Sequence, residues 1–139
     1  MEDCIFCRII RGEIPSIKVY EDESVFAFMD INPISTGHTL VIPKAHAGNI
    51  WEIASEDLSA LHIASKTIAH ALKRALDPDG IACLQLNGEA VGQVVMHYHF
   101  HLVPRIKGAP PLPVTQWELK SGNMDEIKSV AQRITAALQ

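Results

Sequence analysis

A chain of 139 residues with 47% hydrophobic and 20% charged side chains is long enough for one domain and too short for two independent cores. Its 12 Lys and Arg side chains against 16 Asp and Glu give a net charge of -4, which argues against binding to a nucleic acid backbone. No apolar run reaches the roughly 20 residues of a membrane helix, and the acidic start does not resemble a secretory signal, so we expect a cytoplasmic protein. Three cysteines, Cys4, Cys7 and Cys83, are too few for a disulfide framework.

Hydrophobic periodicity predicts an antiparallel sheet covered by helices, an α+β domain. In chain order, the predicted strands are 16–21, 24–31, 38–43, 81–87 and 94–103. Ser55 is predicted to cap a long central helix that ends at the turn 77–80, and Asn123 to cap a last helix. His62 and His70 are expected on the surface of the central helix. Cys83, in an apolar strand, is predicted to be a buried, inert thiol.

Three histidines alternate along the last predicted strand. In a strand, His97, His99 and His101 would share one face, while Tyr98, Phe100 and Leu102 would pack on the other. A solvent-facing strand can carry polar residues at this spacing, but it gains nothing in packing from three clustered titratable rings. Two chemical interpretations remain: one metal bound by the three imidazoles, or a nucleophilic imidazole assisted by its neighbours.

The loop that precedes the histidines favours the nucleophile. Asn87 leads into the segment 88–93, and glycines in such a loop let backbone N–H groups approach anionic oxygens closely. The pattern therefore indicates a site for a phosphate group.

These residues resemble a known family. Residues 92–103, Gly-Gln-Val-Val-Met-His-Tyr-His-Phe-His-Leu-Val, are similar to the His-x-His-x-His-x-x signature of the histidine triad (HIT) superfamily and the Gly-Gln pair before it. Residues 4–15 resemble the N-terminus of its Hint-like branch, and residues 28–46 resemble its middle. The resemblance covers roughly the first three quarters of the chain, with several motifs in the family's order.

The resemblance implies a HIT-like fold, with a HIT domain over 1–107, an arm and helix over 108–139, and subunits whose sheets join in a homodimer. It implies a hydrolase or transferase that acts at the α-phosphate of a purine nucleotide derivative, such as a phosphoramidate, through a covalent nucleotidyl-histidine. One alternative is a dinucleoside polyphosphate hydrolase. The other is a nucleotide-binding module whose hydrolysis is slow and incidental.

The resemblance also implies a role for each matching residue. His99 would be the nucleophile, His101 and Gln93 would contact the phosphate and leaving group, and His38 would belong to the surrounding shell. The nucleotide would also contact Asp30 at the ribose, Asn87 at phosphate or ribose oxygens, the loop at Gly92 and Val94, and an apolar wall of Phe6, Phe28 and Ile31. Val94 stands where the family commonly has Ser or Thr, so that a backbone N–H must replace a hydroxyl donor.

The pair Cys4 and Cys7 has two interpretations. A single Cys-x-x-Cys can be two packed thiols. The resemblance to bacterial HIT proteins adds His46 and His97 as ligands, which would complete a closed, structural Cys₂His₂ zinc site. No cofactor is then required for the chemistry itself.

The proline-containing arm 108–122 has two interpretations as well. In a dimer it could reach across the interface and place Gln116 or Trp117 near the neighbouring cleft. Alternatively, Trp117 packs against the last helix of its own chain.

Overall fold

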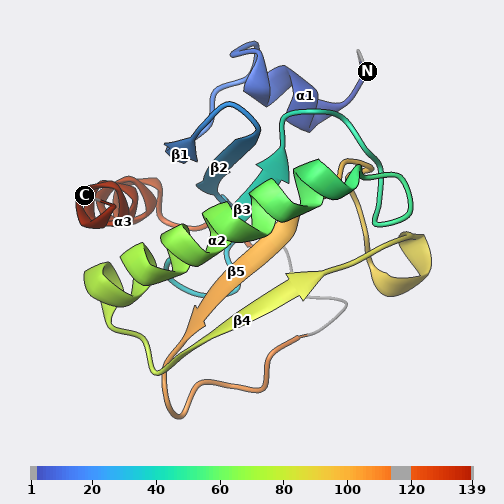
Figure 1. Cartoon of the computed structure of the whole chain (residues 1–139). Helices are drawn as coiled ribbons and strands as arrows, with labels where there is room; N and C mark the ends of the chain where they lie inside the picture. Colours follow the sequence, from blue (N-terminus) through green and yellow to red (C-terminus); the bar gives the residue numbers. More distant parts are fainter. Residues whose placement is uncertain (1–2, 114–119, 139) are drawn as a thin grey trace.

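The computed structural model describes residues 3–113 and 120–138. Gln116 and Trp117, on which the two interpretations of the arm depend, lie outside these residues. The described elements, in chain order, are α1 (Ile5–Ile10), β1 (Lys18–Glu21), β2 (Val25–Met29), β3 (Thr39–Pro43), α2 (Ser55–Leu76), β4 (Gly80–Gln85), the 3₁₀ turn η1 (Glu89–Val91), β5 (Phe100–Arg105) and α3 (Met124–Ala137) (Figure 1). None of the described helices is both long and apolar enough to cross a bilayer.

The five strands form one antiparallel sheet, as the sequence predicts, and their order in the sheet is β1-β2-β3-β5-β4. Every residue of β2 and β3 is buried, because helices cover both faces of these central strands. The long helix α2 lies across one face, and the short α1 lies at the opposite side of the sheet, near the N-terminus (Figure 1).

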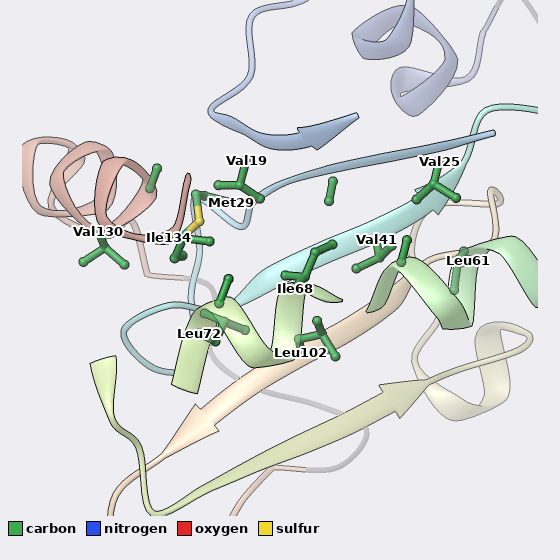
Figure 2. Packing of buried hydrophobic residues seen from close by; sticks show 14 of the residues in the cluster. Val19, Val25, Met29, Val41, Leu61, Ile68, Leu72, Leu102, Val130 and Ile134 are labelled. Atoms are coloured by element: carbon green, nitrogen blue, oxygen red, sulfur yellow. The ribbon is translucent and has the colours of Figure 1, made fainter. Parts of the chain in front are cut away.

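The larger core fills the space between the sheet, α2 and α3 (Figure 2). Val41 and Leu102 project from the sheet toward Ile68 and Leu72 of α2, and all four side chains are buried. The alternate residues of β2 and β3 face the other way and meet α1 in a second cluster. Its buried members are Phe6, Ile9, Phe26, Phe28, Leu40 and Ile42. The period of two along each strand therefore builds a core on one side and an aromatic wall on the other.

Three local predictions are wrong, and one helix was not predicted. The ladder of the last strand begins at Phe100, not at residue 94, so the segment before it is irregular. Helix α1 was missed; the side chain of Cys4 caps it by accepting a hydrogen bond from the Cys7 N–H. Ala54, not Ser55, occupies the N-cap position of α2. Cys83 is exposed, because its strand β4 lies at the edge of the sheet. The predicted Asn123 cap is confirmed, since its side chain accepts a hydrogen bond from the Glu126 N–H.

Candidate active site

The three histidines converge on the aromatic side of the sheet, although only one of them lies in a strand. His101 belongs to β5 and pairs with Leu40 of β3. His97 and His99 lie in the irregular segment before β5, and all three side chains are buried. The His99 and His101 rings lie 5.0 Å apart, centroid to centroid. The prediction that one strand face carries all three rings is wrong, but the rings still gather on one side.

One hydrogen bond determines the tautomer of His99. Its Nδ1 lies 2.7 Å from the carbonyl oxygen of His97. A carbonyl oxygen only accepts, so Nδ1 carries the proton and Nε2 keeps its lone pair. Burial lowers the pKa of the His99 imidazole, which keeps the ring neutral near pH 7. The result is a neutral imidazole with a nucleophilic Nε2.

A second chain of bonds determines the tautomers of His38 and His101. The backbone N–H of Ile34 donates to Nδ1 of His38, so His38 carries its proton on Nε2. That Nε2 lies 2.9 Å from Nδ1 of His101, which therefore accepts, and His101 in turn is protonated at Nε2. Burial lowers the pKa of His38 to about 4 and that of His101 to about 3. Both rings are neutral near pH 7, and Nε2–H of His101 is arranged as a hydrogen-bond donor.

Asp30 closes this side of the site. Its Oδ1 accepts from the Asn32 N–H, and its Oδ2 lies 3.5 Å from Nε2 of His38. Burial raises the pKa of its carboxyl to about 6. Asp30 and His38 also line a cavity of about 230 Å³ between the loop after β2 and the start of α3.

Asp30, His38 and His101 are close enough to share a metal ion, but their hydrogen bonds do not fit one. Nδ1 of His38 already accepts the Ile34 N–H, so Nε2 holds the proton that a metal ligand must lose. If that proton moved to Nδ1 of His38, the new N–H group would point at the Ile34 N–H, and two donors would face each other. This cluster is a hydrogen-bonded relay and not a metal site.

Two residues of the predicted wall for the base, Phe6 and Phe28, meet on the same side. The rings of Phe6 and Phe28 meet edge to face with centroids 5.4 Å apart, and the Phe6 ring also lies 5.3 Å from that of His99. Ile31 is 53% exposed and lies next to Asp30 in the chain. The aromatic part of the predicted wall therefore lies against the predicted nucleophile.

The predicted phosphate loop is held by its own side-chain amides. Gln93 is buried; its Oε1 accepts from the Gly88 N–H, and its Nε2 donates to the carbonyls of Gly48 and Val95. Asn87 exchanges hydrogen bonds with Gln85 and accepts from the Ile50 N–H. Both amides thus join this loop to the loop before α2.

At the loop itself, Gly92 has φ of 96°, a left-handed conformation that favours glycine. Val94 is 82% exposed. The structure therefore places Val94 at the surface of the loop, where its side chain has no hydroxyl to offer an anion.

The remaining motif residues form a compact cluster. The Nδ1 atom of His97 lies 3.3 Å from Cys4 Sγ, 3.6 Å from Cys7 Sγ and 3.2 Å from His46 Nδ1. Cys7 Sγ lies 3.3 Å from His46 Nδ1. A tetrahedral zinc ion with two sulfur and two nitrogen ligands separates its ligand atoms by about 3.3–3.8 Å. The spacing of the four atoms matches a metal site.

The protonation of His97 also fits a metal ligand. Its Nε2 donates to the carbonyl oxygen of Pro43 at 2.8 Å, which leaves a lone pair on Nδ1, the atom that faces the cluster. Burial lowers the pKa of His97 to about 4, so the ring is neutral near pH 7. The bond to Pro43 leaves the ligand atom of His97 without a proton, whereas the bond from Ile34 leaves a proton on Nε2 of His38.

Sequence reasoning missed the backbone groups that orient these rings. The carbonyls of Pro43 and His97 and the N–H of Ile34 each decide a tautomer. No residue type signals such a role, since every residue has a carbonyl and all but proline have an N–H.

Comparison with known proteins identifies a matching family and several similar chains. The HIT domain profile matches residues 11–108. A Hit-like protein from Bartonella henselae superimposes with a TM-score of 0.90 at 41% identity over 99% of this chain and 97% of its own. A zinc-bound histidine triad protein from Mycobacterium smegmatis gives a TM-score of 0.85 at 33% identity, over 99% of this chain and 94% of its own. The adenosine 5′-monophosphoramidase of Candida albicans is 36% identical, over 97% of this chain and 91% of its own.

Proposed function

This chain belongs to the HIT family and is a nucleotide hydrolase, and from that premise we propose that it cleaves purine nucleotide conjugates at the α-phosphate, with phosphoramidates as the preferred class. The observation that carries the proposal is the His99 tautomer: Nδ1–H is held by the His97 carbonyl, so that Nε2 is neutral and free of its proton. The relative from Candida albicans that is named for phosphoramidase activity supports the substrate class.

The reaction divides into two displacements at phosphorus. In the first, Nε2 of His99 forms a bond to the α-phosphorus and the bond from phosphorus to the leaving nitrogen breaks, while this nitrogen takes a proton from solvent and departs as the amine. Nε2–H of the neutral His101 donates a hydrogen bond to the phosphoryl group and keeps its proton. In the second, water attacks the nucleotidyl-imidazole and releases a proton to solvent, and the bond to His99 breaks. The products are the amine and the nucleoside monophosphate.

The surrounding residues bind and orient the substrate in this proposal. His38 holds His101 in the tautomer that donates from Nε2, because it donates to the other nitrogen. Asp30 accepts the ribose hydroxyls, and Phe6, Phe28 and Ile31 contact the base. Asn87, Gly92 and Val94 form the phosphate loop. Because the Gly92 N–H already donates to the Glu89 carbonyl, the backbone donor proposed for the anion is the Val94 N–H. The bonds of Gln93 support a role in holding this loop in place.

Kinetics of His99→Ala test the proposal against a matched control, His62→Ala, which removes an exposed histidine of α2. We expect the His99 variant to lose at least about 10³-fold in kcat on adenosine phosphoramidate while it still binds AMP, because a nucleophile acts mainly in the transition state. The control should retain the wild-type kcat. A His99 variant with near-wild-type turnover would refute the assignment.

A substrate panel separates the alternatives. Adenosine phosphoramidates, dinucleoside polyphosphates and nucleotidyl sugars should be offered to the wild-type protein at equal concentration. A preference for dinucleoside polyphosphates would favour the polyphosphate hydrolase. Slow turnover of every member, with tight AMP binding, would favour a binding module.

We further propose that Cys4, Cys7, His46 and His97 hold one structural zinc ion. The spacing of the four ligand atoms and the Pro43 bond to His97 support this, as does the zinc-bound relative. We expect about one zinc per chain, and a lower melting temperature after chelation, because metal binding is coupled to folding. Cys4→Ser should lose the metal, and Cys83→Ser, at an exposed thiol outside the cluster, should keep it.

The edge strand β4 is the proposed site of homodimerisation. Its burial is only partial, and Ile81, Leu84 and the exposed Cys83 lie along it. Pairing of two such edges would join the sheets of two subunits and cover backbone groups that an edge leaves open. Light scattering should give twice the chain mass. Replacing Leu84 by Lys should shift the mass toward that of the monomer.

A further inference from the structure

We infer that the metal cluster acts on the chemistry as well as on the fold, because the metal ligand His97 is a positioning residue for His99. Metal occupancy and the reactive state of His99 are then coupled: each stabilises the other. The inference rests on the proposed function, since it takes His99 as the nucleophile.

The first step concerns how His97 is held. The ladder of β5 begins only at Phe100, so the segment that carries His97 and His99 is not aligned by strand pairing. The neighbouring Tyr98 N–H donates to the carbonyl of Ala47. His97 itself is held by its side chain, through the Pro43 carbonyl at Nε2 and the cluster at Nδ1.

The second step links His97 to the nucleophile. The same residue that supplies Nδ1 to the cluster supplies the carbonyl that accepts His99 Nδ1–H at 2.7 Å. The ring of Phe6 stands edge to face against both, with centroids 5.8 Å from His97 and 5.3 Å from His99. Phe6 lies between Cys4 and Cys7 in the chain, so the cysteine ligands and this contact share the first turns of α1.

The third step is the effect of removing the metal. The Nδ1 atoms of His46 and His97 lie 3.2 Å apart, and the Pro43 bond keeps Nδ1 of His97 unprotonated. A metal ion satisfies that lone pair, the His46 nitrogen and both sulfurs at once. Without the metal ion, a proton or a water molecule must satisfy these four ligand atoms. The link between His97 and the cysteines of α1 is then weaker. The His97 carbonyl is then free to shift away from His99.

Reciprocity supplies the test. If metal binding favours the placement in which His99 Nδ1–H donates to the His97 carbonyl, then a ligand that binds His99 in this placement must slow the loss of metal. Couplings of about 5-fold to 150-fold between two sites are typical. Adenosine with vanadate is the probe, because vanadate accepts an imidazole nitrogen as a fifth ligand and so mimics phosphorus under attack. Adenosine alone is the reference, because it fills the base and ribose contacts and leaves His99 untouched.

The experiment measures transfer of zinc from the full chain to a chromogenic chelator. Adenosine with vanadate should slow the transfer at least about 5-fold relative to adenosine alone. His99→Ala should abolish this difference, and the control His62→Ala should retain it. Because any ligand that stabilises the fold can slow metal loss, the cobalt(II)-substituted protein gives a second readout. Its visible absorption bands should change with adenosine and vanadate in the wild type, and not in His99→Ala.

The possible outcomes are distinct. If adenosine with vanadate inhibits turnover but changes neither the zinc transfer rate nor the cobalt spectrum, the metal is only structural and the inference is wrong, while the proposed function stands. If it fails to inhibit turnover, His99 is not the nucleophile, and the proposed function and the inference fall together. If the changes persist in His99→Ala, the coupling runs through other contacts, and the role of His97 is refuted.

Discussion

Acidification from pH 7 to pH 5 should destabilise the protein through the buried pair His38 and His101. Both have an ordinary pKa of 6.5, which burial lowers in the folded state to about 4 and about 3. A lowered folded pKa means that only the unfolded chain takes up the proton in this range. The stability that the two neutral rings contribute is therefore present above pH 6.5 and is lost as the pH falls toward 4.

The magnitude follows from these values. Between pH 7 and pH 5, protonation of each of these imidazoles in the unfolded chain lowers the unfolding free energy by about 2 kcal/mol. Asp30 acts in the opposite direction, because its folded pKa is raised from 3.8 to about 6, so that protonating it favours the folded state by about 1 kcal/mol over the same interval. The net expectation for the three groups is a loss of about 2–3 kcal/mol.

Urea denaturation between pH 5 and pH 7, at matched metal content, measures this loss. Replacing His38 by Gln should reduce the dependence of the unfolding free energy on pH by about 1 kcal/mol per pH unit near pH 5, since one proton fewer is taken up on unfolding. His70→Gln, at an exposed position of α2, should leave the dependence unchanged. Equal slopes for wild type and His38→Gln, or an equal reduction in the His70 variant, would refute the reasoning.

Two further predictions concern packing. Gly37 has φ of 91°, and a Cβ there would lie 2.5 Å from Cδ1 of Leu76, so Gly37→Ala should lower the unfolding free energy by about 2–4 kcal/mol. The control is Gly12→Ala, at a similar φ of 78° but with open space around it. This control should lower the unfolding free energy by only about 1 kcal/mol, through backbone strain alone. Ile68 is fully buried between α2 and the sheet, so Ile68→Ala should lower the unfolding free energy by about 2–5 kcal/mol, measured by thermal or urea denaturation. The control Ile63→Ala, at a 70% exposed position of the same helix, should change it by less than about 1 kcal/mol.

Except for the short helix α1, the strands and helices could be predicted in chain order from the sequence, because their patterns are local. The strands β2 and β3 appear as short apolar runs bounded by turn residues, and the apolar face of α2 appears as a spacing of three or four residues. The Asn123 cap is equally local, since its side chain reaches an N–H three residues ahead. Even where boundaries shifted, as at the start of α2, the element itself was predicted.

The chemical residues were also recognisable before the fold. Three histidines at alternate positions after a Gly-Gln pair carry a family resemblance, and the structure brings the four expected ligands of the metal cluster together from three segments of the chain. The resemblance named these residues, but it said nothing of their hydrogen bonds.

Tertiary structure alone decided what each imidazole does. His38, His97 and His99 are the same residue type, yet one donates from Nε2 to another imidazole, one presents Nδ1 to the proposed zinc ligands, and one presents Nε2 to the proposed substrate. The carbonyls and the N–H that make this choice belong to backbone groups that every position shares, so their effect depends on which chain segments meet in space. Contacts between distant segments also explain the short β5 and the exposed Cys83. Gln93 and His97 bond through their side chains to the carbonyls of Gly48 and Pro43 ahead of the ladder, and the strand order places β4 at the edge.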